Sequence, residues 1–494
     1  MTLATFIALA LYFITMLGIG WYAYNKSTSD VAGFMLGGRN LSPGVTALSA
    51  GASDMSGWML MGLPGAMYLT GLSSTWIAVG LVAGAYLNYL IVAPRLRTYT
   101  EVANNSITLP DYFENRFKDR SRMLRLVSSV VIIIFFTLYT SSGVVAGGKL
   151  FESSFGLDYN LGLYITAGVV VLYTLFGGFL AVSLTDFVQG CIMFVALVLV
   201  PVVAIFDIGG IGAVQQSVEQ IDPTLLHLFN GVGFIGILSA MAWGLGYFGQ
   251  PHIIVRFMAI RSIKDIPTAR RIGMSWMIVS ICGAVATGFV GIAYIAKTGA
   301  SLNDAETIFI LLSQLLFHPF IAGFLLAAIL AAIMSTISSQ LLVTSSSLTG
   351  DFYQAFFNKS ASEKQLVRVG RLSVLLVAVV AVMLAFDRNS SILTLVSNAW
   401  AGFGAAFGPV VILSLHWKKM NRNGALAGMI VGALTVLFWI YAPFTINGQS
   451  LSSTLYEIVP GFILSFLTVV IVSKLTYKPD AEMEATFERV LEHH

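Results

Sequence analysis

A single carboxylate inside a strongly apolar stretch, Asp54, is the first candidate for chemistry in this sequence. It lies in the segment Ser49-Ala-Gly-Ala-Ser-Asp-Met-Ser-Gly-Trp58, which is rich in glycine and serine. A charged side chain at the centre of a membrane costs about 2.5 to 3.5 kcal/mol on insertion scales, so Asp54 needs a partner. Asp54 could bind a cation, or it could cap the free N–H groups of a following half-helix, and both can be true.

A second group of oxygen atoms comes from hydroxyl side chains in another apolar stretch. These residues are Ser335, Thr336, Ser338 and Ser339. Sodium is a hard cation that prefers oxygen ligands, including hydroxyls and backbone carbonyls. Small hydroxyl residues are also common where membrane helices pack, and they often bond to their own backbone. The spacing alone favours packing over an ion site.

Further candidates are one more acid and four aromatic residues. Asp186 is expected near the start of an apolar run, as a second acid on an ion path or as a charge that offsets a helix dipole. Trp58, Tyr139, Trp243 and Tyr247 lie on interrupted or neighbouring runs, where aromatic faces could surround an apolar ring and receive an ammonium group. Taken singly, each aromatic residue is more often a packing or interface residue.

The composition shows what kind of scaffold must position these residues. The chain has 494 residues, of which 57% are hydrophobic and only 10% charged, and its mean hydropathy is +0.83. This composition excludes a soluble domain and predicts an all-α membrane protein within the lipid bilayer. Cys191 and Cys282 lie in apolar runs without nearby ligands, so neither a disulfide nor a metal site is expected. No enzymatic activity, nucleic acid or obligate protein partner is implied.

Apolar runs of about 20 residues, long enough to cross a bilayer, predict thirteen transmembrane spans. Their ranges are 2–24, 42–70, 73–93, 124–152, 159–179, 184–207, 231–256, 273–297, 318–349, 370–386, 392–415, 424–443 and 454–476. With the N-terminus outside, 24 of the 27 basic residues, Arg256 among them, fall in cytoplasmic segments or at the cytoplasmic ends of spans, which supports a cytoplasmic C-terminus. The connections 94–123 and 208–230 are expected to be loops. One transmembrane domain over 1–476 is predicted, followed by a short cytoplasmic tail over 477–494 that could end in a tag remnant at 491–494.

Two of the predicted spans should be interrupted near mid-membrane. The segments 49–57 and 244–251 contain glycine, proline and polar residues that are poor helix interiors. Paired interrupted helices are the best sequence pointer to the binding site of a secondary transporter. Because the two are five spans apart, the chain fits two inverted five-helix repeats, over 39–207 and 231–415.

Several sequence blocks resemble the sodium/solute symporter family over essentially the whole chain. These blocks are Leu36-Gly-Gly-Arg-Asn-Leu41, Thr46 to Trp58, Leu63-Pro-Gly-Ala66, Leu109-Pro-Asp-Tyr-Phe113, Gly177 to Ser183, Trp243-Gly-Leu-Gly-Tyr-Phe-Gly-Gln-Pro-His252, Met334-Ser-Thr336 and Ala399 to Pro409. The resemblance implies a leucine-transporter-type fold with one added N-terminal and two added C-terminal helices. It also implies sodium-coupled symport of L-proline across a bacterial cytoplasmic (inner) membrane by alternating access.

The resemblance also implies roles for individual residues. A sodium ion would be bound by the carbonyls of Ala52, Met55 and Ala332 and by the hydroxyls of Ser335 and Thr336. Proline would be surrounded by Asp54, Ser56, Gly57, Trp58, Tyr139, Trp243, Tyr247 and Pro251. Asp186 would lie on the path of ion release. A family member for another solute, such as a sugar or pantothenate, and a channel or receptor remain the alternatives.

Overall fold

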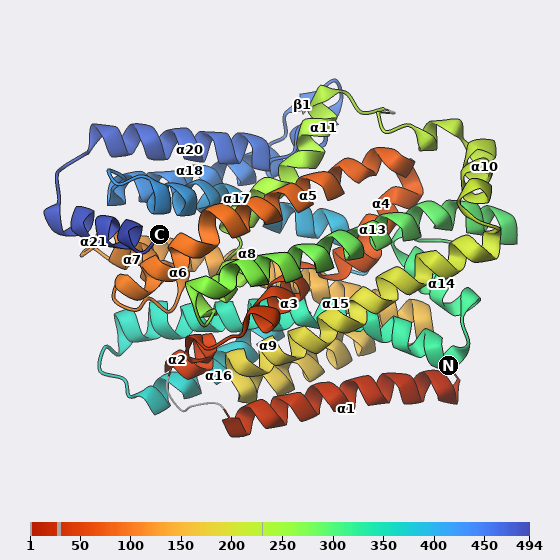
Figure 1. The fold of residues 1–494 in the computed structure, drawn as a ribbon, viewed down its shortest axis with the longest axis horizontal. Coiled ribbons are helices and arrows are strands. Elements are labelled where there is room, and N and C mark those ends of the chain that lie inside the picture. Colours follow the sequence, from red (N-terminus) through yellow and green to blue (C-terminus); the bar gives the residue numbers. More distant parts are fainter. Residues whose placement is uncertain (1, 27–30, 230) are drawn as a thin grey trace.

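The computed structural model describes residues 2–26, 31–229 and 231–494, and most of these residues are helical. The long helices run roughly along the longest axis of the molecule, and the two termini lie at opposite ends of it (Figure 1). Among the described residues, ten helical stretches are long and apolar enough to cross a membrane. The multi-pass membrane architecture is therefore confirmed, whereas the count of thirteen spans stays a prediction.

The helices fall into long, interrupted and connecting elements. The long helices are α1 (Leu3–Lys26), α5 (Thr75–Leu87), α8 (Met123–Phe155), α9 (Tyr159–Ile208), α13 (Ile266–Thr298), α15 (Pro319–Ser346), α16 (Glu363–Leu384), α17 (Ile392–His416), α18 (Arg422–Tyr441) and α20 (Ile458–Leu475). The interrupted ones are α3 (Pro43–Asp54) with α4 (Leu63–Thr70), and α11 (Phe234–Met241) with α12 (Pro251–Ala259). The connecting elements are α2 (Val31–Leu36), α6 (Ala93–Val102), α7 (Leu109–Phe117), α10 (Ile211–Ile221), α14 (Ile308–Leu316), α19 (Leu451–Thr454), α21 (Ala481–Glu492) and the hairpin of β1 (Thr445–Ile446) and β2 (Gln449–Ser450).

Both predicted interruptions are confirmed. Helix α3 ends at Asp54, and the chain becomes helical again just before Trp58, where a π-helical turn leads into α4. In the second interruption, a 3₁₀ segment over Ala242–Gly249 follows α11, and the extended Gln250 precedes α12. Glycine permits this shape, because a Cβ at Gly244 would lie 2.2 Å from the carbonyl oxygen of Gly80 on α5.

Helix α9 contains the predicted boundary between two spans. Gly178 breaks it with φ 59° and ψ −145°, a conformation that other residues rarely adopt. A Cβ at Gly178 would also lie only 2.7 Å from the ring of Phe34. The second half of α9 therefore starts a few residues earlier than the sequence predicted.

Helix α15 lies at the centre of the helix packing and carries the hydroxyl residues. It packs against α1, α8 and α9 and also contacts α3. Its most apolar window is 83% buried, the highest share of the ten candidate spans. Hydroxyls on α15 therefore face other helices, where they can contact polar groups of the interrupted α3.

Two expected loops contain helices instead. The connection 94–123 includes most of α6 and all of α7, and the connection 208–230 includes α10. The tail forms α21, in which Phe487 packs against Tyr99 with ring centroids 6.2 Å apart. Arg116 lies over the same Phe487 ring at 5.4 Å. Short amphipathic segments of this kind become helical because tertiary contacts stabilise them.

Candidate functional site

The carboxylate of Asp54 is buried where α3 ends. Its Oδ2 accepts a hydrogen bond from the hydroxyl of Tyr247 at 2.5 Å, and its Oδ1 has no hydrogen-bond partner among the described residues. The N–H of Trp58 is directed at the hydroxyl of Ser56 at 3.4 Å, not at Asp54. The capping interpretation of Asp54 is therefore not supported, because within the described chain no backbone N–H donates to its carboxylate.

The break between α3 and the next helical turn is closely packed. The indole N–H of Trp58 donates to the carbonyl of Asp54 at 3.1 Å, across the interruption. A Cβ at Gly57 would lie 3.1 Å from the Cβ of Ala146 on α8, so only a very small residue fits there. Ser56 and Trp58 are both buried. The sequence-predicted residues of this segment thus form one compact unit at the end of α3.

The predicted sodium ligands come together from α3 and α15. The hydroxyl of Ser335 donates to the carbonyl of Ala52, 283 residues away in sequence, and lies 3.1 Å from the carbonyl of Ala332. The hydroxyl of Thr336 lies 3.3 Å from the same Ala332 carbonyl. Met55 is buried directly after α3, where its backbone has left the helix. The structure therefore gathers the oxygen atoms of four of the five predicted ligands into one cluster.

Asp186 forms a fully buried ion pair that the sequence did not predict. Its Oδ2 lies 2.9 Å from Nη2 of Arg256 and accepts a hydrogen bond from Ser49 at 2.8 Å. Arg256 also donates to the hydroxyl of Ser339 at 2.6 Å. Asp186 lies eight residues after Gly178, so its interpretation as a charge in the first helical turn is wrong. Arg256, the last residue of the predicted span 231–256, is buried between α3, α9 and α15.

The aromatic residues occupy different surroundings. Tyr247, besides its bond to Asp54, packs edge-on against Trp400 with ring centroids 5.0 Å apart. The ring of Trp243 instead packs against Tyr456 at 5.2 Å. Tyr139 is buried, and its hydroxyl has no partner among the described residues. The structure thus places Tyr247 directly on Asp54, whereas Trp243 contacts a residue near α20.

A small cavity adjoins the Asp54 carboxylate. It has a volume of about 30 Å³, enough for a water-sized group, and Asp54, Asn88 and Tyr247 line it. The side-chain oxygen of Asn88 is also unpartnered in the described part of the chain. The site is therefore nearly closed in this conformation.

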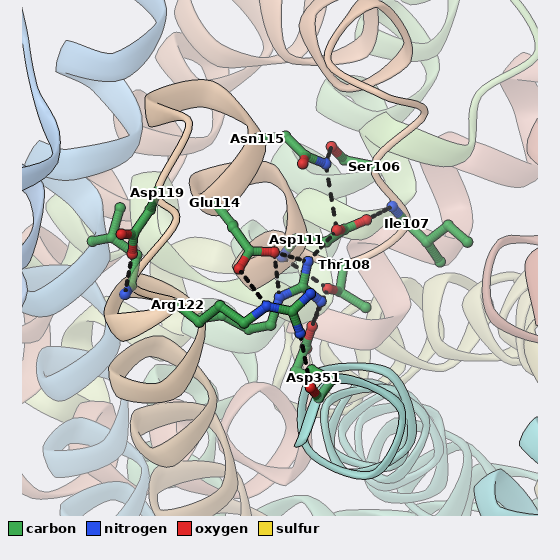
Figure 2. Close-up of polar contacts among 12 residues, drawn as sticks. Ser106, Ile107, Thr108, Asp111, Glu114, Asn115, Asp119, Arg122 and Asp351 are labelled. Carbon is green, nitrogen blue, oxygen red and sulfur yellow. Dashed lines mark hydrogen bonds and ion pairs between the residues drawn. The ribbon is translucent and has the colours of Figure 1, made fainter. Parts of the chain in front are cut away.

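A network of ion pairs lies at the end of the molecule that carries α7 and α21. Arg125 contacts Asp111 and Glu114 on α7, and its Nη1 lies 2.9 Å from Asp351. Figure 2 shows Asp111, Glu114 and Asp351 gathered in this network. Thr108 donates to the same Asp351 at 3.0 Å. Beside this network lies a cavity of about 260 Å³. A smaller cavity shares Thr108 with it and is also lined by Pro251, the first residue of α12.

Arg39 connects further segments at the same end of the molecule. It donates to the carbonyl of Met258 at 2.6 Å and to that of Ser106, and so connects the segment before α3 with α12 and with the start of α7. Burial, with the charge of Arg97 as a smaller cause, lowers the pKa of Arg39 to about 10. Arg39 therefore remains charged at neutral pH.

Interrupted helices that carry polar groups to one buried place within a membrane bundle are typical of secondary transporters. The family model for the sodium:solute symporter family matches residues 34–432. This chain belongs to the sodium:solute symporter family. It is therefore a multi-pass membrane transporter and not an enzyme.

Bacterial relatives match almost the full length of the chain. The osmoregulated proline transporter OpuE of Bacillus subtilis is 61% identical over 479 residues, which cover 97% of this chain and 96% of OpuE. The high-affinity proline transporter PutP of the same organism is 61% identical over 472 residues, covering 96% and 98%. A sodium/proline symporter of Staphylococcus aureus is 56% identical over 489 residues, covering 98% and 95%.

Solved structures share the fold at low sequence identity. A sodium-coupled sialic acid symporter in a substrate-bound, outward-open state has a TM-score of 0.82 at 21% identity, covering 97% of this chain and 99% of that one. Mhp1, a nucleobase-cation-symport-1 family transporter in a closed conformation, has a TM-score of 0.56 at 14% identity, covering 92% and 98%. At such identities the likeness concerns the fold alone.

Proposed function

We propose that this protein carries L-proline into the cell together with sodium, by alternating access. The proposal is supported by relatives at 56% to 61% identity that are named as proline transporters or sodium/proline symporters. The observation that carries it is the contact between α3 and α15, where Ser335 meets the Ala52 carbonyl beside the buried Asp54. This cluster has the oxygen chemistry that a sodium ion requires.

In the proposed site, sodium is bound by the carbonyls of Ala52, Met55 and Ala332 and by the hydroxyls of Ser335 and Thr336. Proline is bound by Asp54, Ser56, Gly57, Trp58, Tyr139, Trp243, Tyr247 and Pro251. Asp186 lies on the path by which the ion is released. The cavities between Pro251 and the Arg125 network are consistent with a path for release at that end of the molecule.

The expected driving force is sufficient for concentrative uptake. One sodium ion that crosses a potential of about 150 mV releases roughly 3.5 kcal/mol, and a tenfold gradient adds about 1.4 kcal/mol. Coupled one to one, this supports roughly 3,000-fold accumulation of a solute without net charge, such as the proline zwitterion. Coupling requires that sodium favours the conformation that binds proline better.

For the arrangement in the membrane, we propose a leucine-transporter-type fold with thirteen spans and inverted repeats over 39–207 and 231–415. In this arrangement the N-terminus is outside and the C-terminus is in the cytoplasm, so that the end with α7 and α21 is cytoplasmic. The positions of the termini at opposite ends of the molecule are consistent with an odd number of crossings (Figure 1).

The test is uptake of radiolabelled L-proline into proteoliposomes that contain the purified protein. An inward sodium gradient should drive accumulation, and a potassium gradient of the same size should not. Galactose and pantothenate serve as competing solutes, and neither should reduce proline uptake. Sodium-driven uptake of one of these solutes, without uptake of proline, would contradict the proposed substrate and leave the family unchanged.

We predict that the hydroxyls of Ser335 and Thr336 bind the sodium ion. Replacing Ser335 or Thr336 by Ala removes one oxygen ligand, so we expect the sodium concentration for half-maximal proline uptake to rise about tenfold. The matched control is Ser338→Ala on the same helix, because the Ser338 hydroxyl donates to the Ser335 carbonyl at 3.0 Å and is not one of the proposed ligands. An unchanged sodium dependence in both variants would exclude these residues as ligands.

We predict that the hydroxyl of Tyr247 strengthens proline binding through its hydrogen bond to the Asp54 carboxylate. Tyr247→Phe keeps the ring against Trp400 but removes the hydrogen bond to the buried carboxylate, which we expect to weaken proline binding by about tenfold. Tyr441→Phe is the control, because Tyr441 is 75% exposed. Calorimetric titration with proline in sodium buffer measures the proline affinity of both variants. Equal affinities of the wild type and Tyr247→Phe would show that this bond is dispensable.

A further inference from the structure

His252 is a buried polar residue that has no role in the proposed sodium and proline sites. It is the second residue of α12 and therefore directly follows the interruption, and its relative exposure is 0%. Neither of its ring nitrogens has a hydrogen-bond partner among the described residues. Its ring lies edge-on against Phe136 and Tyr139, with centroid distances of 5.3 and 5.8 Å.

A buried imidazole without a hydrogen-bond partner is unusual, because the ring can form strong hydrogen bonds. In its neutral form it offers one N–H donor and one acceptor nitrogen. Buried polar groups in proteins are nearly always hydrogen-bonded, and each exception calls for an explanation. The hydroxyl of Tyr139, next to His252, is buried and unpartnered as well, within the described chain. Two adjacent buried side chains thus each carry a donor without a protein partner in the described part of the chain.

The charges around these two donors are arranged in a way that suits a zwitterion. Asp54 has one carboxylate oxygen without a hydrogen-bond partner among the described residues, and its other oxygen accepts from the hydroxyl of Tyr247. A carboxylate on this side suits an ammonium group. His252 and Tyr139 instead present N–H and O–H donors, and the first turn of α12 adds the positive end of a helix dipole. This side suits an anionic oxygen.

We propose that His252, together with Tyr139, binds the carboxylate of the transported amino acid, while Asp54 faces its ammonium group. This assignment rests on the proposed function, and it adds a residue that determines specificity at the same site. A ligand that lacks the carboxylate would leave both donors without a partner. The site would therefore discriminate strongly between an amino acid and its uncharged amide.

The experiment compares L-proline with L-prolinamide, which lacks the negative charge, as ligands in calorimetric titrations in sodium buffer. His252→Phe keeps an aromatic ring against Tyr139 but removes both nitrogens, and His252→Gln restores a donor and an acceptor. We expect His252→Phe to weaken proline binding about tenfold or more and to change prolinamide binding by less than about threefold. His252→Gln should recover most of the proline affinity. His227→Phe, at an exposed histidine, is the control and should bind both ligands as the wild type does.

An equal loss of affinity for both ligands, or no loss in His252→Phe, would overturn the assignment. In His252→Phe, the sodium concentration that gives half-maximal binding, measured at a saturating proline concentration, should stay within about threefold of the wild type. The reason is that the proposed ion ligands lie on α3 and α15. If His252→Phe does not fold, His252→Met replaces it as the apolar partner of His252→Gln, with the same outcomes. A wild-type protein that binds no proline in sodium would contradict the proposed function itself, which separates the two failures.

Discussion

Asp54→Asn should abolish sodium-driven proline uptake while the protein still folds. Asn has nearly the same shape as Asp and can still accept the hydrogen bond from Tyr247, but it carries no charge. A buried carboxylate beside an ion and an ammonium group contributes mainly through its charge, so we expect the uptake rate to fall by about 100-fold or more. Initial rates in proteoliposomes measure the loss, and the melting temperature in detergent reports folding.

The control for this prediction is Asp158→Asn. Asp158 is exposed and precedes α9 without forming a side-chain cap, so the substitution removes the same charge from the surface of the described chain. It should leave both uptake and melting temperature unchanged. Wild-type uptake and sodium response in Asp54→Asn would mean that the carboxylate takes no part in binding the ion or the solute.

Local sequence signals were sufficient to predict the membrane scaffold and its two interruptions. The break after Asp54 follows from the glycine and serine residues around it, and the break before Pro251 follows from glycine and the missing N–H of proline. Both are properties of neighbouring residues. The same holds for the long apolar helices, because a bilayer requires continuous apolar runs.

Contacts between distant segments could not be predicted in this way. Ser335 and the Ala52 carbonyl are 283 residues apart, and from spacing alone the Ser335 hydroxyl looked like a packing residue. Arg256 was expected at the cytoplasmic end of a span, because no local pattern indicates its pairing with Asp186 on α9. The position of Arg256 four residues after His252, in the last turn of an apolar half-helix, was the one available signal. Helices α7 and α10 were missed because their short amphipathic segments are stabilised by contacts and not by propensity.

The ion pair of Asp186 and Arg256 makes the second strong prediction. Arg256→Met keeps much of the side-chain volume but leaves the Asp186 carboxylate buried without its counter-charge, which should cost about 3 to 5 kcal/mol of stability. The double variant Asp186→Asn with Arg256→Met removes both charges and should recover a large part of that loss. Thermal unfolding in detergent measures the order of stability: wild type, then the double variant, then Arg256→Met.

The matched control is Arg261→Met, which breaks the pair of Arg261 with Asp265 just beyond the end of α12. The Arg261 side chain is 58% exposed, and exposed pairs contribute at most about 1 kcal/mol. Its melting temperature should therefore stay close to that of the wild type.

If Asp186 lies on the path of ion release, the double variant should also fold yet transport proline slowly, since a neutral Asn cannot attract the departing ion. A double variant that is as unstable as Arg256→Met would show that the guanidinium stabilises the bundle through Ser49 and Ser339 and not through the charge of Asp186.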